Sequence, residues 1–141
     1  MGMAEFVKAS KTDPALEKDG VWIDYKGGVS LRCRRANSDN VEYCAAFERM
    51  LKKHGRSIEN DALPMKEVNR LMAEIYADTV VTEWKGVTDW KNLSDTTPLS
   101  FTRENVIAFL TDWPDEFKFA QRIARGKDAY LAEVEDLDIK N

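Results

Sequence analysis

The sequence predicts a mainly helical α+β fold, with an N-terminal β-hairpin packed on about four α-helices. Two observations predict it. Apolar and polar residues alternate with period two on both sides of a Gly-Gly pair near the N-terminus, a pattern typical of a β-hairpin. Apolar residues then recur at spacings of three and four, as they do along one face of a helix. With 141 residues, the chain is long enough to bury one core without a metal or disulfide staple.

The chain divides into three predicted segments. Residues 1–18 mix small, charged and polar types, and we expect them to form a flexible N-terminal arm. Residues 19–135 are expected to form a single α+β domain, because 43% hydrophobic and 33% charged residues are typical of a globular protein. Residues 136–141 are expected to form a frayed tail that continues an acidic stretch.

The predicted hairpin begins after Gly20. Residues 21–25 read Val-Trp-Ile-Asp-Tyr and are rich in β-formers. Residues 29–34 alternate, so that Ser30, Arg32 and Arg34 share one face and the apolar residues share the other. Gly27 and Gly28 lie between the two arms, where a turn is required.

Two predicted helices follow the hairpin. The Asn-Ser-Asp-Asn cluster at 37–40 offers N-caps to a helix over 41–53, which we expect to end at Gly55. The longest periodic segment, 64–84, is predicted to be one helix that ends at Gly86. Its Val-Val-Thr stretch at 80–82 is β-branched, which weakens a helix locally.

Two further helices are predicted after a polar loop over 91–100. Thr102 is a natural N-cap for the first. Pro114 is suited to the first position of the second, because its fixed φ favours a helix start and its missing N–H is not needed there. Gly126 marks a bend or a break in this last helix.

The sequence offers no catalytic set, and we expect no enzyme activity, no cofactor and no metal. His54 is the only histidine, and it lies in a Lys-Lys-His-Gly-Arg stretch where a solvated cation near a helix end is the simpler interpretation. Cys33 and Cys44 have no paired ligand spacing and are expected to be reduced thiols. No glycine-rich phosphate loop is present.

Charge and hydropathy weigh against two classes of partner. The net charge of -4 disfavours a dedicated nucleic-acid binder. A hairpin face and a helix end nevertheless carry basic residues that could make a local patch: Arg32, Arg34, Arg35, Lys52, Lys53 and Arg56. No apolar run approaches the roughly 20 residues of a membrane span. The first eleven residues lack the apolar segment of a signal peptide.

Several segments in a fixed order carry a resemblance to a known family. They read Asp-Gly-Val-Trp at 19–22, Leu-Arg-Cys-Arg-Arg-Ala-Asn at 31–37, Ala-Asp-Thr-Val-Val-Thr-Glu-Trp-Lys-Gly-Val at 77–87, Pro-Leu-Ser-Phe-Thr-Arg-Glu-Asn at 98–105 and Phe-Leu-Thr-Asp-Trp-Pro-Asp-Glu-Phe at 109–117. Over about residues 19–131, the chain resembles the tail assembly chaperones of long-tailed bacteriophages and prophages. It departs from them at 94–97, where many relatives have a glycine-containing turn.

The resemblance implies a non-enzymatic protein of the bacterial host cytoplasm that is absent from the mature virion. It implies that the partner is the phage tape-measure protein, which such chaperones escort while the tail tube polymerises. The tail-tube protein and a second copy of the chain are further expected partners. The alternatives are a virion structural protein, such as a tail-completion or connector component, and a small nucleic-acid-binding regulator that uses the arginine-rich hairpin.

Aromatic density supplies the candidate partner-binding residues, which the resemblance itself does not assign. Large aromatic side chains are favoured anchors of protein interfaces. Core packing is the competing interpretation for at least half of them; we expect Trp84 in the core and Trp90 to be exposed. The five residues expected to line a binding groove are Trp84, Trp90, Phe101, Trp113 and Phe117.

Overall fold

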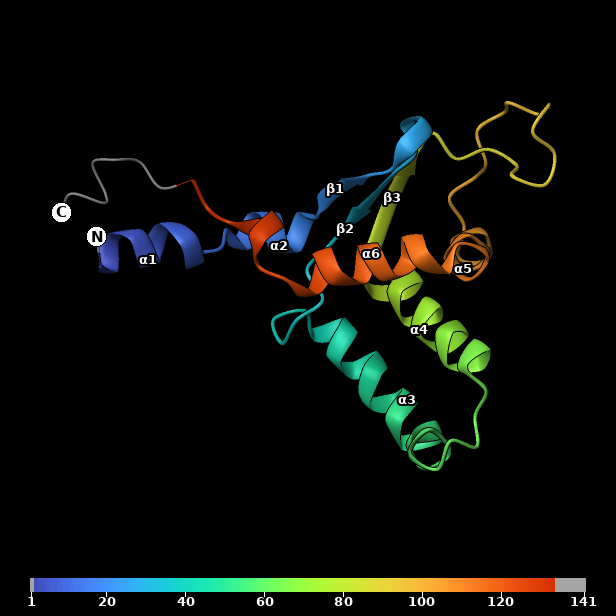
Figure 1. The fold of residues 1–141 in the computed structure, drawn as a ribbon, viewed down its shortest axis with the longest axis horizontal. Helices are drawn as coiled ribbons and strands as arrows, with labels where there is room; N and C mark the ends of the chain where they lie inside the picture. The colour runs from blue at the N-terminus through green and yellow to red at the C-terminus, as the bar shows by residue number, and fades with distance from the viewer. Residues whose placement is uncertain (1, 134–141) are drawn as a thin grey trace.

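A computed structural model describes residues 2–133 of the chain, and it has a small antiparallel sheet joined to a set of helices (Figure 1). The strands are β1 (Val21–Asp24), β2 (Ser30–Cys33) and β3 (Val81–Lys85), in the order β1-β2-β3. The main helices are α3 (Val41–Glu59), α4 (Met65–Thr79), α5 (Arg103–Asp112) and α6 (Pro114–Arg125). The predicted mainly helical α+β fold is therefore confirmed.

The predicted hairpin is present. β1 and β2 pair in register from Val21 opposite Cys33 to Asp24 opposite Ser30. The turn contains a short 3-10 segment, η1 (Lys26–Gly28), in which both glycines have a φ of 78°. That conformation is open to glycine and strained for most other residues, which explains the Gly-Gly pair.

The helix predicted over 64–84 is wrong in its last part, where the structure has the third strand. α4 ends at Thr79, and β3 then pairs with β2 from Ser30 opposite Lys85 to Cys33 opposite Val81. The β-branched stretch at 80–82 favours a strand, and the open edge of β2 supplies backbone partners for it. Helical periodicity up to this point could not reveal a pairing with a strand some fifty residues earlier in the chain.

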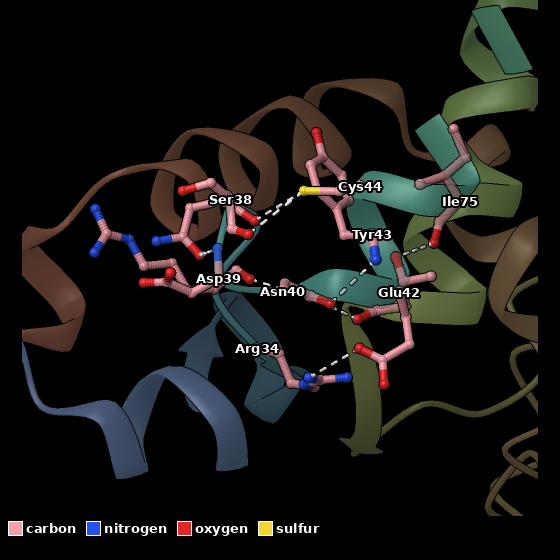
Figure 2. Close-up of polar contacts among 11 residues, drawn as sticks. Arg34, Ser38, Asp39, Asn40, Glu42, Tyr43, Cys44 and Ile75 are labelled. Carbon is pink, nitrogen blue, oxygen red and sulfur yellow. Dashed lines mark hydrogen bonds and ion pairs between the residues drawn. The ribbon is translucent and has the colours of Figure 1, made fainter. Parts of the chain in front are cut away.

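α3 begins at the predicted cap but runs past its predicted end. Asn40 Oδ1 accepts a hydrogen bond from the Tyr43 backbone N–H at 3.1 Å, as Figure 2 shows. The helix continues through Gly55 to Glu59, since one interior glycine costs only about 1 kcal/mol. His54, expected at the helix end, therefore lies inside α3. The hairpin of α3 and α4 forms one end of the molecule (Figure 1).

α5 and α6 begin where the sequence predicts. Thr102 Oγ1 accepts from the Asn105 N–H at 3.2 Å, and Pro114 is the first residue of α6. Gly126 ends α6, and a short 3-10 segment, η2 (Asp128–Tyr130), follows. The buried Tyr130 hydroxyl donates to the Cys33 carbonyl at 2.9 Å, which ties the end of the described chain to β2.

Two helices stand where the sequence predicted a flexible arm over 1–18. They are α1 (Met3–Ser10) and α2 (Pro14–Asp19), and Asp13 caps α2 through its side chain. Residues 12–19 are held against the body, because Thr12 forms a bridge with Leu131 and Glu17 pairs with Arg35 at 2.9 Å. α1 buries no residue and points away from the body (Figure 1). The predicted tail over 136–141 lies outside the described residues.

The core lies between the inner face of the sheet and helices α4, α5 and α6. Its residues come from all of these elements, whereas α3 contributes none; they include Ile23, Leu31, Cys33, Tyr76, Val80, Val106, Leu110, Phe117, Ala120 and Ala124. Cys33 and Cys44 are both free thiols, as expected. Within residues 2–133, none of the helices combines the length and hydropathy needed to cross a bilayer.

Candidate functional site

An apolar groove of about 270 Å³ lies where the hairpin turn, the loop after β3 and the junction of α5 and α6 meet. Its lining is mostly aromatic and aliphatic, with Lys26 and Glu116 as the charged members. The large apolar side chains that line it are Tyr25, Val29, Val87, Trp90, Leu93, Phe109 and Trp113. Apolar concavities with a few polar groups are the usual form of binding sites in proteins.

Gly86 makes this arrangement sterically possible. Its φ is 72°, and a Cβ at this position would collide with the Gly28 carbonyl oxygen of the hairpin turn. Only glycine both adopts this conformation without strain and admits so close an approach. The hairpin turn therefore packs directly on the end of β3, and Val29 and Val87 come together as one wall of the groove.

The loop between β3 and α5 is held in shape by its own polar side chains. Asp89 Oδ1 accepts from the Lys91 N–H at 3.0 Å, and Asp95 Oδ1 accepts from the Thr97 N–H at 3.0 Å. Such Asx turns replace backbone hydrogen bonds that a loop lacks. The loop presents Leu93, which is 80% exposed, at the mouth of the groove.

Trp90 is fixed in orientation at one side of the groove. Its Nε1 donates to Asp112 Oδ2 at 2.9 Å, and its ring stands edge-to-face against Phe109 with centroids 5.8 Å apart. The side chain is half-buried, so the expected exposure of Trp90 is met only in part. A half-buried, oriented indole leaves one apolar surface free for a ligand.

Trp113 lies at the junction of α5 and α6. Pro114 disfavours helical geometry in the residue before it, and Trp113 accordingly has φ -120° and ψ 68°. Its side chain stays 39% exposed and lines the groove together with Trp90. Two of the five predicted residues therefore meet at this site.

Trp84 and Phe101 form a separate aromatic pair. Their rings are edge-to-face at 5.4 Å, and Trp84 Nε1 donates to the Leu99 carbonyl at 3.1 Å. Trp84 packs against the core as expected, and its ring also contacts Phe109. Neither residue lines the groove, although Phe101 is exposed beside α5.

The assignment of Phe117 to the groove needs correction. Phe117 is only 3% exposed, and its ring packs edge-to-face on Tyr76 at 5.2 Å. The reason is the register of α6, which places Phe117 on the same buried face as Ala120 and Ala124. A residue in this position stabilises the core and offers no surface to a partner.

Five of the seven large apolar groove residues were not predicted from the sequence: Tyr25, Val29, Val87, Leu93 and Phe109. Leu93 could have been noticed as the one large apolar side chain within the polar stretch 91–97. Tyr25 and Val29 flank the Gly-Gly turn and were assigned only to the hairpin. No pattern in the sequence places that turn beside the later loop, because their contact depends on β3.

The groove has a neutral floor, and its lining carries one lysine and one glutamate. The Tyr25 hydroxyl donates to the Glu116 carbonyl at 2.7 Å. Burial, followed by the nearby Cys33 and Glu116, raises the pKa of Tyr25 well above its ordinary value, so the phenol stays neutral. The charged side chains of the lining are Lys26 and Glu116, and the Asp112 carboxylate beside Trp90 accepts a hydrogen bond from its indole.

The arginine-rich hairpin does not form a free basic patch. Arg35 pairs with Glu17, Arg34 with Glu42 at 3.5 Å (Figure 2), and Arg32 approaches Glu83 at 4.0 Å. On the same sheet face, Lys85 Nζ lies 3.8 Å from the centre of the Trp22 ring. These contacts compete with any base that would stack on Trp22 or any phosphate that would bind the arginines.

Metal-binding clusters are absent from residues 2–133, in which no three His, Cys, Asp or Glu side chains come together. His54 instead lines a mixed polar and apolar hollow between α3 and α4, with Leu71 and Glu74. The groove beside Trp90 and Trp113 is therefore the feature of the described chain best suited to binding a partner.

Comparison with known proteins identifies the origin of the chain. No curated protein and no solved structure gives a significant match. A family model described as "YdaY prophage protein" matches residues 37–141, which is more than half of the chain. The match includes α3 to α6, β3 and the loop that carries Trp90 and Leu93. This chain belongs to the YdaY prophage protein family.

Proposed function

We propose that this prophage protein is a tail assembly chaperone that binds the tape-measure protein in the host cytoplasm. The role is non-enzymatic, and the protein leaves the tail before the virion is complete. Membership of a prophage family supports the phage setting. The ordered segments between residues 19 and 131 that resemble tail assembly chaperones support the specific role.

The observation that carries the proposal is the apolar groove with Trp90, Leu93 and Trp113 at its mouth. Exposed apolar side chains gathered around a concavity are typical of partner-binding surfaces. Tryptophan is enriched among the residues that dominate binding energy. The Trp90 indole is already held by Asp112 and Phe109 of α5, so its binding to a partner loses little conformational entropy.

The groove fits an amphipathic helix of a long helical partner. Such a helix inserts apolar side chains at spacings of three and four into a hydrophobic groove. The two charged residues of the lining, Lys26 and Glu116, can each meet an opposite charge that flanks an apolar stripe. Many copies bound along one tape-measure protein would gain from effective concentration, so each contact can remain weak enough to release.

The proposal is tested by co-expressing the tagged chain with the long tape-measure protein of its own prophage. We expect the wild-type chain to retain that protein. Leu93→Glu and Trp113→Glu should lower retention by about tenfold or more, because a charge would enter an apolar contact. Met65→Glu changes an equally exposed apolar residue on α4 and should leave retention unchanged.

Two results would overturn the proposal. One is a wild-type chain that fails to retain the tape-measure protein. The other is unchanged retention by Leu93→Glu and Trp113→Glu chains whose circular dichroism matches the wild type. Mass spectrometry of purified particles separates the main alternative, since a stoichiometric copy number would favour a tail-completion or connector component.

A further inference from the structure

α1 is a short helix with an uncovered apolar side. It has 8 residues, and isolated helices shorter than about 12–15 residues are marginal in water. It buries none of its side chains and points away from the body (Figure 1). Met3 and Phe6 share one side of the helix and are 70% and 61% exposed. A segment that covers this side would therefore stabilise α1.

The C-terminal end of the described chain lies next to the end of α1. The Ala132 N–H donates to the Lys11 carbonyl at 2.8 Å, beside an antiparallel bridge between Thr12 and Leu131. Lys11 directly follows α1 in the sequence. Because the two paired segments run in opposite directions, the segment that ends at Glu133 runs toward α1.

The residues that follow Glu133 are acidic, whereas α1 is basic at the end nearest to them. Residues 134–141 read Val-Glu-Asp-Leu-Asp-Ile-Lys-Asn, with three carboxylates and one lysine. Lys8 in the last turn of α1 and Lys11 after it form no ion pair with any other residue of 2–133. Opposite charges on neighbouring segments favour a contact between them.

The segment is also long enough to cover the exposed side of α1. The helix is about 12 Å long, and the four residues from 134 to 137 span about 13 Å when extended. Leu137 can therefore come level with Met3 and Phe6. Leu137 and Ile139 are two positions apart, so an extended backbone places both on one side.

We propose that residues 134–141 dock on the exposed side of α1, antiparallel to it, with Leu137 against Met3 and Phe6. The carboxylates of the segment then lie beside the two lysines at the end of the helix. This contact keeps α1 helical and removes two large apolar side chains from water. The partner of this surface is a segment of the same chain, so a second copy is not needed.

The contact is independent of the proposed tape-measure site. None of the described residues that line the groove belongs to α1. α1 and the loop that follows β3 lie at opposite ends of the molecule (Figure 1). Each proposal can therefore fail without the other.

Amide hydrogen exchange of the full chain, compared with a chain that ends at Glu133, tests the contact. The amides of α1 should exchange about tenfold or more faster in the shortened chain, because the helix loses its cover. The amides of α6 should exchange at the same rate in both chains, which shows that the body remains folded. In the full chain, nuclear Overhauser contacts should join the Phe6 ring to the Leu137 methyl groups.

Matched substitutions separate the apolar contact from a general effect of charge. Leu137→Glu in the full chain should speed exchange in α1 as the truncation does, because it places a charge in an apolar contact. Leu93→Glu, the same substitution on a distant exposed leucine, should leave exchange in α1 unchanged.

A charge exchange tests the ionic part of the contact. Lys8→Glu with Lys11→Glu should speed exchange in α1, partly because acidic residues disfavour a helix C-terminus. Addition of Glu135→Lys and Asp136→Lys to that variant should slow the exchange again, since opposite charges then face each other. This recovery is not expected from an effect on the helix alone, and its absence would overturn the ionic part of the contact.

Equal exchange of the α1 amides in the full and shortened chains would overturn the proposal. So would the absence of contacts between Phe6 and Leu137 in the full chain. Protection of α1 that rises with protein concentration would also overturn it, because a second copy would then cover the helix. Retention of the tape-measure protein by the shortened chain should match the wild type, since the groove is unchanged.

Discussion

The sheet-centred body and the α3–α4 hairpin are both built from amphipathic elements but differ in how far their apolar faces are covered. In the body, Leu31 is 0% exposed at the centre of the sheet. In the hairpin, Leu51 on the amphipathic helix α3 remains 46% exposed. α4 passes from one region to the other, because its buried residues are all in its second half, from Ala73 to Thr79.

This difference shows what apolar periodicity predicts. It indicates which face of an element turns away from water, but not whether the chain itself has enough surface to cover that face. In the body, three strands and three helices cover one another. In the hairpin, α3 packs chiefly on α4, and Leu51 stays partly exposed.

The largest effect is expected from Leu31→Ala. Removal of a fully buried leucine side chain leaves a cavity, and the free energy of unfolding should fall by about 2–5 kcal/mol. Chemical denaturation followed by circular dichroism measures it. A loss below about 1 kcal/mol would contradict the position of Leu31 in a tightly packed core.

Asn40 joins the two regions, and Asn40→Ala should lower the free energy of unfolding by about 2–4 kcal/mol. Its Oδ1 caps α3, while its Nδ2 donates to the carbonyls of Arg35 and Thr79 at 3.1 and 3.0 Å. Asn40→Asp keeps the cap and loses both donated bonds. If both variants were as stable as the wild type, Asn40 would not hold the hairpin to the body.

Cys33 provides a pH-dependent probe of the body. Burial raises the pKa of its thiol from 9.0 to about 12. Above pH 9 the unfolded thiol releases its proton while the folded one keeps it, so the Cys33 contribution to stability should fall as pH rises, by at most about 1.4 kcal/mol per pH unit. Cys33→Ala should show a shallower decline in the free energy of unfolding between pH 9 and pH 11 than the wild type. An identical slope would contradict a buried, protonated thiol.

The Cys33 thiol should also react more slowly than the Cys44 thiol with a disulfide reagent. Cys44 is half-exposed at the start of α3, whereas Cys33 is buried in β2. In the folded protein at neutral pH, we expect Cys44 to react quickly and Cys33 to react only on unfolding. Mass spectrometry of the labelled peptides identifies them, and rapid labelling of Cys33 would indicate an open sheet.

The smallest effect is expected from Leu51→Ala in dilute solution. Because the side chain is already 46% exposed, the free energy of unfolding should change by only about 0.5–1 kcal/mol. The loss in free energy of unfolding should therefore be much smaller for Leu51→Ala than for Leu31→Ala, and this gap measures the difference between the two regions. An equally large loss for Leu51→Ala in a monomeric sample would remove that difference.

Features that depend on nearby residues were predictable from the sequence. The β1–β2 hairpin follows from alternation around Gly27 and Gly28, and the helix starts follow from Asn40, Thr102 and Pro114. Each of these signals acts over a few residues. The end of α3 was missed because the cost of one interior glycine is smaller than the stability gained by an additional helical turn.

Features that depend on contacts between distant residues were not predictable from the sequence. β3 forms because β2 offers an open edge, and no helical pattern over residues 64–84 contains that information. Aromatic density identified Trp90 and Trp113 as site residues, but it could not separate them from Phe117, whose burial depends on the register of α6. Leu93 becomes a groove residue only because Gly86 lets the hairpin turn pack close to the loop that carries it.

The most direct test of the account is a co-expression pull-down of the prophage tape-measure protein with two matched variants, Leu93→Glu and Leu51→Glu. We expect Leu93→Glu to lose the tape-measure protein, because Leu93 lies at the mouth of the groove. We expect Leu51→Glu, the same substitution on a distant leucine outside the groove, to retain the tape-measure protein as the wild type does. Retention that is unchanged in a folded Leu93→Glu chain would contradict the central claim that the groove of Trp90 and Trp113 binds the partner.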